Sequence, residues 1–131
     1  MTGYLLDTHI WYWYLVGSRK IPGAIRRKLD ADLSSSWLSP ISVWELAMLA
    51  AKGRVEIPAD FRGWTTEAMR RMPLRSATMN FEVALKSQEI RLSHRDPADH
   101  FLAATALTYD LVLLTVDENL LGLEWLPASS G

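Results

Sequence analysis

The chain contains no cysteine among its 131 residues. This absence excludes a disulfide framework and any metal site with thiolate ligands, and it fits a reducing compartment, so we expect a cytoplasmic protein. Long hydrophobic runs are also missing, because no apolar stretch approaches the ~18 residues of a membrane span. Asp7 interrupts the first apolar run, which argues against a signal peptide. We therefore expect a soluble protein without a membrane partner.

The chain also has no large excess of positive or negative residues, since its formal net charge is −1. Any contact with nucleic acid would therefore depend on local basic patches rather than on overall charge. The length and the 49% of hydrophobic residues are typical of one globular domain that can bury its own core. We expect this domain to span residues 1–127, followed by a loose tail at 128–131.

Short apolar runs alternate with helical patterns along the whole chain, which is typical of an α/β fold with a central, mainly parallel sheet flanked by helices. The expected strands are residues 3–7, 36–38, 111–115 and, at an edge, 123–126. The expected helices are residues 8–16, 22–32, 40–52, 60–71, 80–89 and 97–108.

Two aspartates each follow an apolar strand. Asp7 ends the first strand, and Asp117 closes the run at 111–115. Ligand sites of open α/β sheets lie beyond the carboxyl ends of strands, so both carboxylates are expected at one edge of the sheet. The alternative for each is a structural N-cap of the helix that follows.

Glu45 is the most anomalous acid. Residues 40–51 contain only two polar side chains, Ser42 and Glu45, so this helix should be largely buried. A buried carboxylate costs roughly several kcal/mol unless it is paired or binds a metal. The alternatives are a glutamate at the helix edge or a buried pair with an arginine.

Asp96 and Asp99 lie at the expected start of a helix, in the pattern Asp-Pro-x-Asp. From the residues alone both are explained by capping, with Asp96 as the N-cap and Asp99 favoured by the helix dipole. If these acids nevertheless converge with the other three, a cation must neutralise them. Mg²⁺ prefers such oxygen ligands, and two ions about 4 Å apart recur in phosphodiester cleavage.

Four segments, taken in order, resemble the motifs of the PIN-domain family, specifically the VapC-type toxins of toxin–antitoxin pairs. They are YLLDTHIW at 4–11, SPISVWELA at 39–47, HRDPADHFLAATA at 94–106 and LLTVD at 113–117. The resemblance covers almost the whole chain and implies a PIN-like single domain.

The resemblance also implies a site and an activity. It assigns the catalytic and metal-binding roles to Asp7, Glu45, Asp99 and Asp117. The accessory residues that it implies are Thr8, Asp96 and Thr115. The implied activity is that of a Mg²⁺- or Mn²⁺-dependent endoribonuclease, the toxin of a type II module, acting on structured RNA such as tRNA. The implied partners are a second copy of the chain and a cognate VapB-type antitoxin.

The chain departs from the family at His100 and Val116, where relatives often carry arginine, and both changes remove positive charge near the acids. Arg95, beside the third motif, is the first candidate for a contact with RNA. The aromatic run at 11–14 is interpreted as part of a partner groove or dimer face, with core packing and base stacking as the alternatives.

Two other functions stay open. A phosphatase of the haloacid dehalogenase type also uses an aspartate after its first strand, but it needs a second one two residues later, where this chain has His9. A catalytically silent interaction domain with the PIN fold is the other alternative.

Overall fold

The computed structural model describes residues 3–93 and 96–131. Within them, five strands form one sheet in the order β3-β2-β1-β4-β5, and every neighbouring pair is parallel. The strands are β1 (Tyr4–Leu6), β2 (Ser36–Leu38), β3 (Arg75–Ser76), β4 (Val112–Leu114) and β5 (Ala128–Ser129). The α/β class with a parallel sheet is confirmed.

Helices connect and cover these strands. Those in the described residues are α1 (Thr8–Val16), α2 (Gly23–Ala31), α3 (Pro40–Ala51), α4 (Phe61–Arg71), α5 (Phe81–Glu89), α6 (Pro97–Tyr109) and α7 (Glu118–Leu121), with a 3₁₀ turn at Leu33–Ser35. Side chains that accept a backbone N–H bond cap the starts of most of them, as Ser39 does for α3 and Asn80 for α5. The six predicted helices are confirmed to within two residues at either end.

Three predictions about the sheet were wrong or incomplete. The segment 123–126 is a turn rather than an edge strand, and its apolar pattern is explained by Leu126, which is buried in the core. The edge strand is β5, so Ala128–Ser129 belong to the sheet and not to a loose tail. The short β3 was missed because its residues Arg75 and Ser76 are exposed and polar.

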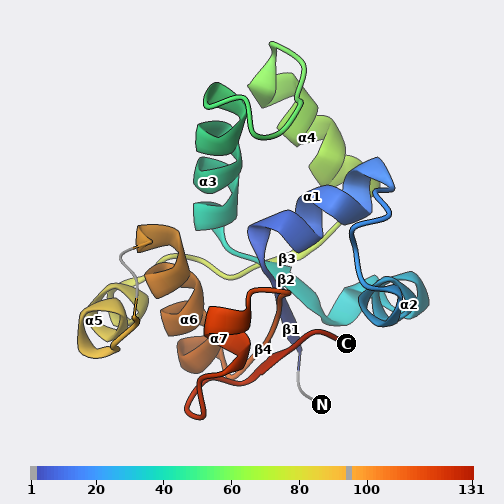
Figure 1. The fold of residues 1–131 in the computed structure, drawn as a ribbon. Helices are drawn as coiled ribbons and strands as arrows, with labels where there is room; N and C mark the ends of the chain where they lie inside the picture. Colours follow the sequence, from blue (N-terminus) through green and yellow to red (C-terminus); the bar gives the residue numbers. More distant parts are fainter. Residues whose placement is uncertain (1–2, 94–95) are drawn as a thin grey trace.

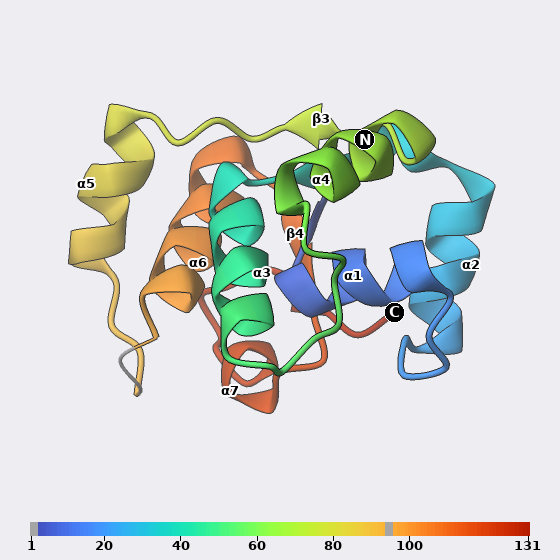
Figure 2. The ribbon, with the colours of Figure 1, turned by 90° about the horizontal axis from the view of Figure 1, so that it is seen from above.

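The sheet separates two hydrophobic clusters. On one face, Leu6 and Leu114 pack with side chains of α1, α2 and α4. On the other face, Leu5 and Leu113 pack with side chains of α6 and α7. Consecutive residues of a strand point to opposite faces, which explains this division. Figures 1 and 2 show α2 and α5 at opposite ends of the molecule, with α1, α3 and α6 between them.

The carboxyl edge of the sheet is where several helices begin. α1 follows β1 directly, α3 follows β2, and α7 follows β4. α3 is less buried than its composition predicts, because Trp44 and Met48 are exposed on its outer face. No helix of the described ranges has the length and apolarity needed to cross a membrane.

Candidate active site

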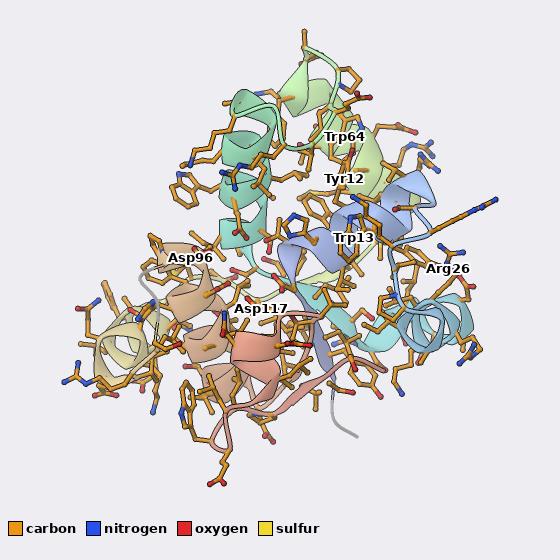
Figure 3. All side chains as sticks on the ribbon, viewed as in Figure 1. Tyr12, Trp13, Arg26, Trp64, Asp96 and Asp117 are labelled. Atoms are coloured by element: carbon orange, nitrogen blue, oxygen red, sulfur yellow. The ribbon has the colours of Figure 1, made fainter. Side chains whose placement is uncertain are left out.

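One pocket of about 230 Å³ lies at the carboxyl edge of the sheet. Its walls come from the starts of α1, α6 and α7 and from the middle of α3. Figure 3 shows Asp96 at the start of α6 and Asp117 at the start of α7, on this side of the molecule. The pocket is lined by Asp7, Glu45, Asp96, Asp99 and Asp117, together with His9, Ile10, Trp13 and Val116. The structure thus brings all five acids singled out in the sequence to one place.

Asp7 is the most constrained of these acids. Its side chain is 9% exposed, and Oδ1 accepts a 2.7 Å hydrogen bond from the backbone N–H of Thr8, so Asp7 also caps α1. Oδ2 accepts a 2.6 Å bond from the Thr115 hydroxyl. Burial raises the pKa of Asp7, while these two hydrogen bonds oppose the rise. Capping and membership of the pocket are therefore not alternatives at this residue.

Thr8 and Thr115 lie beneath the pocket of acids and make hydrogen bonds that position its residues, and both are fully buried. The Thr8 hydroxyl donates to the Ser42 hydroxyl at 3.0 Å, which ties the start of α1 to α3. The Thr115 hydroxyl, besides donating to Asp7, accepts a 3.0 Å bond from the backbone N–H of Asp117. The sequence analysis assigned no role to Ser42, although Ser42 and Glu45 are the two polar residues of an otherwise apolar helix.

Asp117 ends the connection from β4 and begins α7. Its Oδ1 accepts a 2.9 Å bond from the backbone N–H of Asn119, so it is the N-cap of α7. The parallel pairing of β1 with β4 places Asp117 and Asp7 at neighbouring strand ends. The Asp117 charge contributes to the raised pKa of Asp7, which is consistent with two carboxylates close together.

Glu45 enters the pocket from α3 without a cationic partner. Among the described residues no lysine or arginine lies within ion-pair distance of it, and its Oε1 is buried without a hydrogen-bond partner. Burial, followed by the charges of Asp7, Asp96 and Asp99, raises the pKa of Glu45 to about 7. A buried pair with arginine, one of the alternatives, is absent from the described part of the chain.

Asp96 and Asp99 occupy the first turn of α6. Asp96 is the N-cap, and its Oδ1 accepts a 3.0 Å bond from the backbone N–H of Ala98. Asp99 is only 6% exposed, so it is more buried than the cap residue. His100 contacts the Asp96 carbonyl through Nδ1 at 3.1 Å. Arg95, the first candidate for a contact with RNA, lies outside the described residues, as does His94 at the start of the third motif.

The donor set of the pocket fits a hard divalent cation. Five carboxylates line a space that no described lysine or arginine enters, and one buried oxygen of Glu45 lacks a donor. Carboxylate oxygens are what Mg²⁺ and Mn²⁺ prefer. The side chains do not form a finished cage, since in residues 3–93 and 96–131 no three acidic or histidine side chains are close enough to hold an ion together.

The aromatic run does not act as one unit. Trp11 is buried in the core, whereas Tyr12, Trp13 and Tyr14 are half-buried. The Tyr12 hydroxyl donates to the Glu56 carbonyl at 2.9 Å, and the Tyr14 hydroxyl donates to Asp30 at 2.6 Å. Core packing accounts for Trp11, and Trp13 reaches the pocket of acids.

Comparisons with known proteins agree with this geometry. The PIN domain family model matches residues 4–125. Ribonuclease VapC22 of Mycobacterium tuberculosis is 30% identical over 124 residues, which cover 92% of this chain and 91% of that protein. Similar sequence therefore extends over nearly the full length of both chains.

Solved structures share the fold at lower identity. VapBC2 from Rickettsia felis, bound to a DNA fragment from its promoter, superposes with a TM-score of 0.69 at 16% identity and covers 96% of each chain. A toxin–antitoxin complex from Klebsiella pneumoniae gives 0.65 at 21% identity, covering 97% of this chain and 96% of that one. FitAcB from Neisseria gonorrhoeae gives 0.60 at 23% identity and covers 88% of both. The parallel sheet gathers acids at its carboxyl edge, the family model matches residues 4–125, and ribonuclease VapC22 is 30% identical over nearly the whole chain. The chain therefore belongs to the PIN-domain family and is of the VapC type.

Proposed function

We propose that the chain is a divalent-metal-dependent endoribonuclease, the toxin of a type II toxin–antitoxin module. The observation that carries this proposal is the pocket of five carboxylates at the carboxyl edge of the sheet, where Glu45 keeps a buried oxygen without a donor. Further support is the 30% identity to a protein named as a ribonuclease.

In this proposal the metal-binding side chains are those of Asp7, Glu45, Asp99 and Asp117. A bound Mg²⁺ or Mn²⁺ would supply Lewis-acid chemistry for hydrolysis of an RNA phosphodiester. Asp7 is already oriented by two hydrogen bonds, so little of its side-chain freedom remains to be lost on binding. Glu45, with a pKa near 7, gives up a proton when it becomes a ligand, and binding therefore strengthens as the pH rises.

The substrate we propose is structured RNA such as tRNA, cut in an unpaired region. A catalytic pocket lined by five carboxylates, with His9 beside them, must draw a phosphate in through bound cations and through basic side chains outside the pocket. Proteins commonly read RNA in unpaired loops, where bases are accessible for stacking.

An antitoxin is the proposed protein partner. Support comes from the solved neighbours, which are described as toxin–antitoxin complexes. A mostly apolar groove of about 500 Å³ lies between α3 and α4. Its lining includes Val43, Met69, Met72 and Leu74, and Met69 is 45% exposed. Flexible methionines adapt to an inserted apolar segment, so we assign this groove to the antitoxin.

A homodimer is the proposed assembly. Phe81 and Leu85 lie one turn apart on α5 and are 90% and 61% exposed, and Trp44 and Met48 repeat this pattern on α3. α5 and α3 both contact α6, which lies between them. Exposed apolar side chains grouped in this way are typical of an interface.

The decisive experiment is cleavage of total RNA and of a tRNA by the purified protein with Mg²⁺, with Mn²⁺ and with excess EDTA. We expect defined fragments with either ion and none with EDTA. Sequencing of RNA ends after brief expression without the antitoxin then identifies the cut site. Intact RNA under all three conditions would contradict the proposal and favour the silent interaction domain.

A further inference from the structure

A second groove of about 430 Å³ adjoins the pocket of acids, between α1 and the segment that follows α3. It is called the α1 groove here. Its lining includes His9, Tyr12, Trp13, Lys20, Arg54 and Glu56. His9 and Trp13 also line the pocket of acids, so the two hollows share a wall. A chain that crosses the acids can therefore continue into the α1 groove.

Both rims of the α1 groove are tied in place. On one rim, the Arg26 side chain donates to the Ser18 carbonyl at 2.6 Å and fixes the turn that carries Lys20. On the other, the Tyr12 hydroxyl bonds the Glu56 carbonyl and fixes the segment that carries Arg54. Figure 3 shows Tyr12, Trp13 and Arg26 on this side of the molecule. The groove is thus built by side chains rather than left between loose loops.

The charge of the α1 groove is opposite to that of the neighbouring pocket. Lys20 and Arg54 line it, and in the described residues neither has a carboxylate within ion-pair distance. Glu56 is the acid of this lining, and its exposed carboxylate offsets one of the two positive charges, so the excess of charge in the groove is positive. Two cationic side chains without ion-pair partners can bind an RNA phosphate. Because they lie beside the pocket of acids, this phosphate would be the neighbour of the one that is cleaved there.

The shared wall is aromatic. His9 and Trp13 lie one turn apart on α1, with ring centroids 5.4 Å apart and planes inclined by 46°. Trp13 is half-buried, so part of its indole is accessible from the groove. Aromatic rings combined with lysine or arginine are the elements with which proteins bind single-stranded nucleic acid.

We propose that the α1 groove binds one unpaired RNA nucleotide directly beside the cleaved phosphodiester, with its base against Trp13 and its phosphate at Lys20 and Arg54. This inference rests on the proposed ribonuclease function. It assigns recognition of the flanking nucleotide to residues outside the acidic motifs. It also supplies, from the turn after α1 and the segment after α3, positive charge that His100 and Val116 do not provide beside the acids.

The test measures binding of a fluorescent single-stranded oligonucleotide to Asp7→Asn protein, which we expect not to cleave it. Cleavage is measured with protein that keeps Asp7. The double variant Lys20→Ala/Arg54→Ala is compared with a control double variant, Arg27→Ala/Arg91→Ala. The control removes the same charge from exposed positions outside the groove. We expect the first pair to weaken binding about tenfold or more. The slope of log affinity against log salt should become shallower by about 0.7, since both cations contact the same phosphate and each neutralised phosphate on a single strand contributes about 0.7. The second pair should leave affinity, slope and kcat/KM near the wild-type values.

Trp13 has its own variants. Trp13→Leu should weaken binding without changing the salt slope, by about fivefold to 150-fold if one base loses its stacking partner. Trp13→Phe keeps a ring and should restore most of the affinity, which separates stacking from a fault in folding.

Three results would overturn the assignment of the α1 groove. The first is an equal loss of RNA affinity in the two double variants, and the second is an unchanged RNA affinity of Trp13→Leu. The third is a double variant of Lys20 and Arg54 that loses antitoxin binding but keeps RNA binding, since the groove would then belong to the antitoxin. Failure of the proposed function is recognised separately, because wild-type protein would then cut no RNA with Mg²⁺ or Mn²⁺. The binding data on Asp7→Asn protein would still decide the groove in that case.

Discussion

Thr115 and Asp7 lie 108 positions apart in the chain, and the hydroxyl of one donates a 2.6 Å hydrogen bond to the carboxylate of the other. The same hydroxyl oxygen accepts from the backbone N–H of Asp117. A single buried side chain therefore positions acids at two neighbouring strand ends. Outer groups that orient ligands in this way usually matter nearly as much as the ligands themselves.

Thr115→Val should reduce RNA cleavage by about 10-fold to 100-fold, because Asp7 and Asp117 both lose a fixed partner. The lost hydrogen bond to Asp7 is one that lowers its pKa. We therefore expect the rise of activity with pH to shift to higher pH, which a pH–rate profile measures. Thr115→Ser keeps the hydroxyl and should restore both rate and profile. A rate loss in Thr115→Val without a pH shift would point to packing alone.

Asp7→Asn should abolish cleavage and leave the fold intact. The change removes one charge from five carboxylates that repel one another, but it leaves one oxygen for the two donors at Thr8 and Thr115. Because these effects oppose each other, the melting temperature without metal should change little. The matched control is Asp110→Asn, at an exposed position with a φ of 54°, a backbone conformation that asparagine tolerates. This variant should cut RNA at the wild-type rate. Wild-type cleavage by Asp7→Asn would show that the site is assigned wrongly.

Glu45→Gln tests the raised pKa of this residue, about 7 in the folded chain against 4.5 as the ordinary value. Because the folded state holds the proton more tightly, this carboxyl stabilises the fold below about pH 4.5, and that contribution is lost as the pH rises toward 7. Without metal, the wild-type melting temperature should therefore fall between pH 5 and pH 8 along this range.

Glu45→Gln should flatten this pH dependence and be more stable than the wild type at pH 8. The gain should be on the order of 1–2 kcal/mol, once screening at a partly exposed group is allowed for. Its stabilisation by Mg²⁺ should be smaller than that of the wild type. Calorimetry with and without Mg²⁺ measures both effects, and a lower metal-free stability of the variant would mean that Glu45 is held by a favourable partner.

Asp99 and Asp96 should differ in kind. Asp99→Asn should cost more activity than Asp96→Asn, because the buried Asp99 is a proposed ligand while asparagine is itself a good N-cap. Asp96→Ala removes the cap and should cost about 1 kcal/mol of stability. Cleavage rates and urea unfolding of the three variants give the ranking. If Asp96→Asn proved the more damaging to cleavage, the two residues would exchange roles.

The exposed apolar side chains of α5 test the proposed dimer. Phe81→Glu with Leu85→Glu should turn a homodimer into monomers, because a charge at each position opposes burial of the surface. Light scattering after size exclusion measures the change. Ala31→Glu, at an exposed position on α2 at the opposite end of the molecule, is the control and should remain dimeric. If the wild type were monomeric as well, the assembly proposal would fail.

How far the sequence predicts this protein depends on the kind of signal. The helices were predictable because capping residues mark the starts of most of them, as Asp96 and Ser39 do. Asp7 and Asp117 were predictable as neighbours because both end buried strands. The prediction that Asp99 belongs to the site came from the resemblance to the PIN-domain family. From the neighbouring residues alone, Asp99 is an ordinary acid in the first turn of a helix.

Other features carry no local signal. β3 consists of exposed Arg75 and Ser76, and its pairing with β2 is made by backbone groups that the side chains do not reveal. The α1 groove joins Lys20 to Arg54 from two turns far apart in the chain, and neither turn has a composition that suggests binding. Only the tertiary fold brings such residues together.

The edge strand β5 has a consequence for synthesis of the protein. Its Ser129 carbonyl accepts a 3.0 Å bond from the backbone N–H of Thr115, and the Pro127 carbonyl accepts one from Leu113. A ribosome that has made the chain as far as residue 110 has already produced Asp7, Glu45 and Asp99, yet not β4, Thr115 or Asp117. Translation products that stop before residue 129 lack the hydrogen bond that supports the backbone of Thr115, so we expect aborted chains to hold Asp7 and Asp117 less firmly than the full chain does.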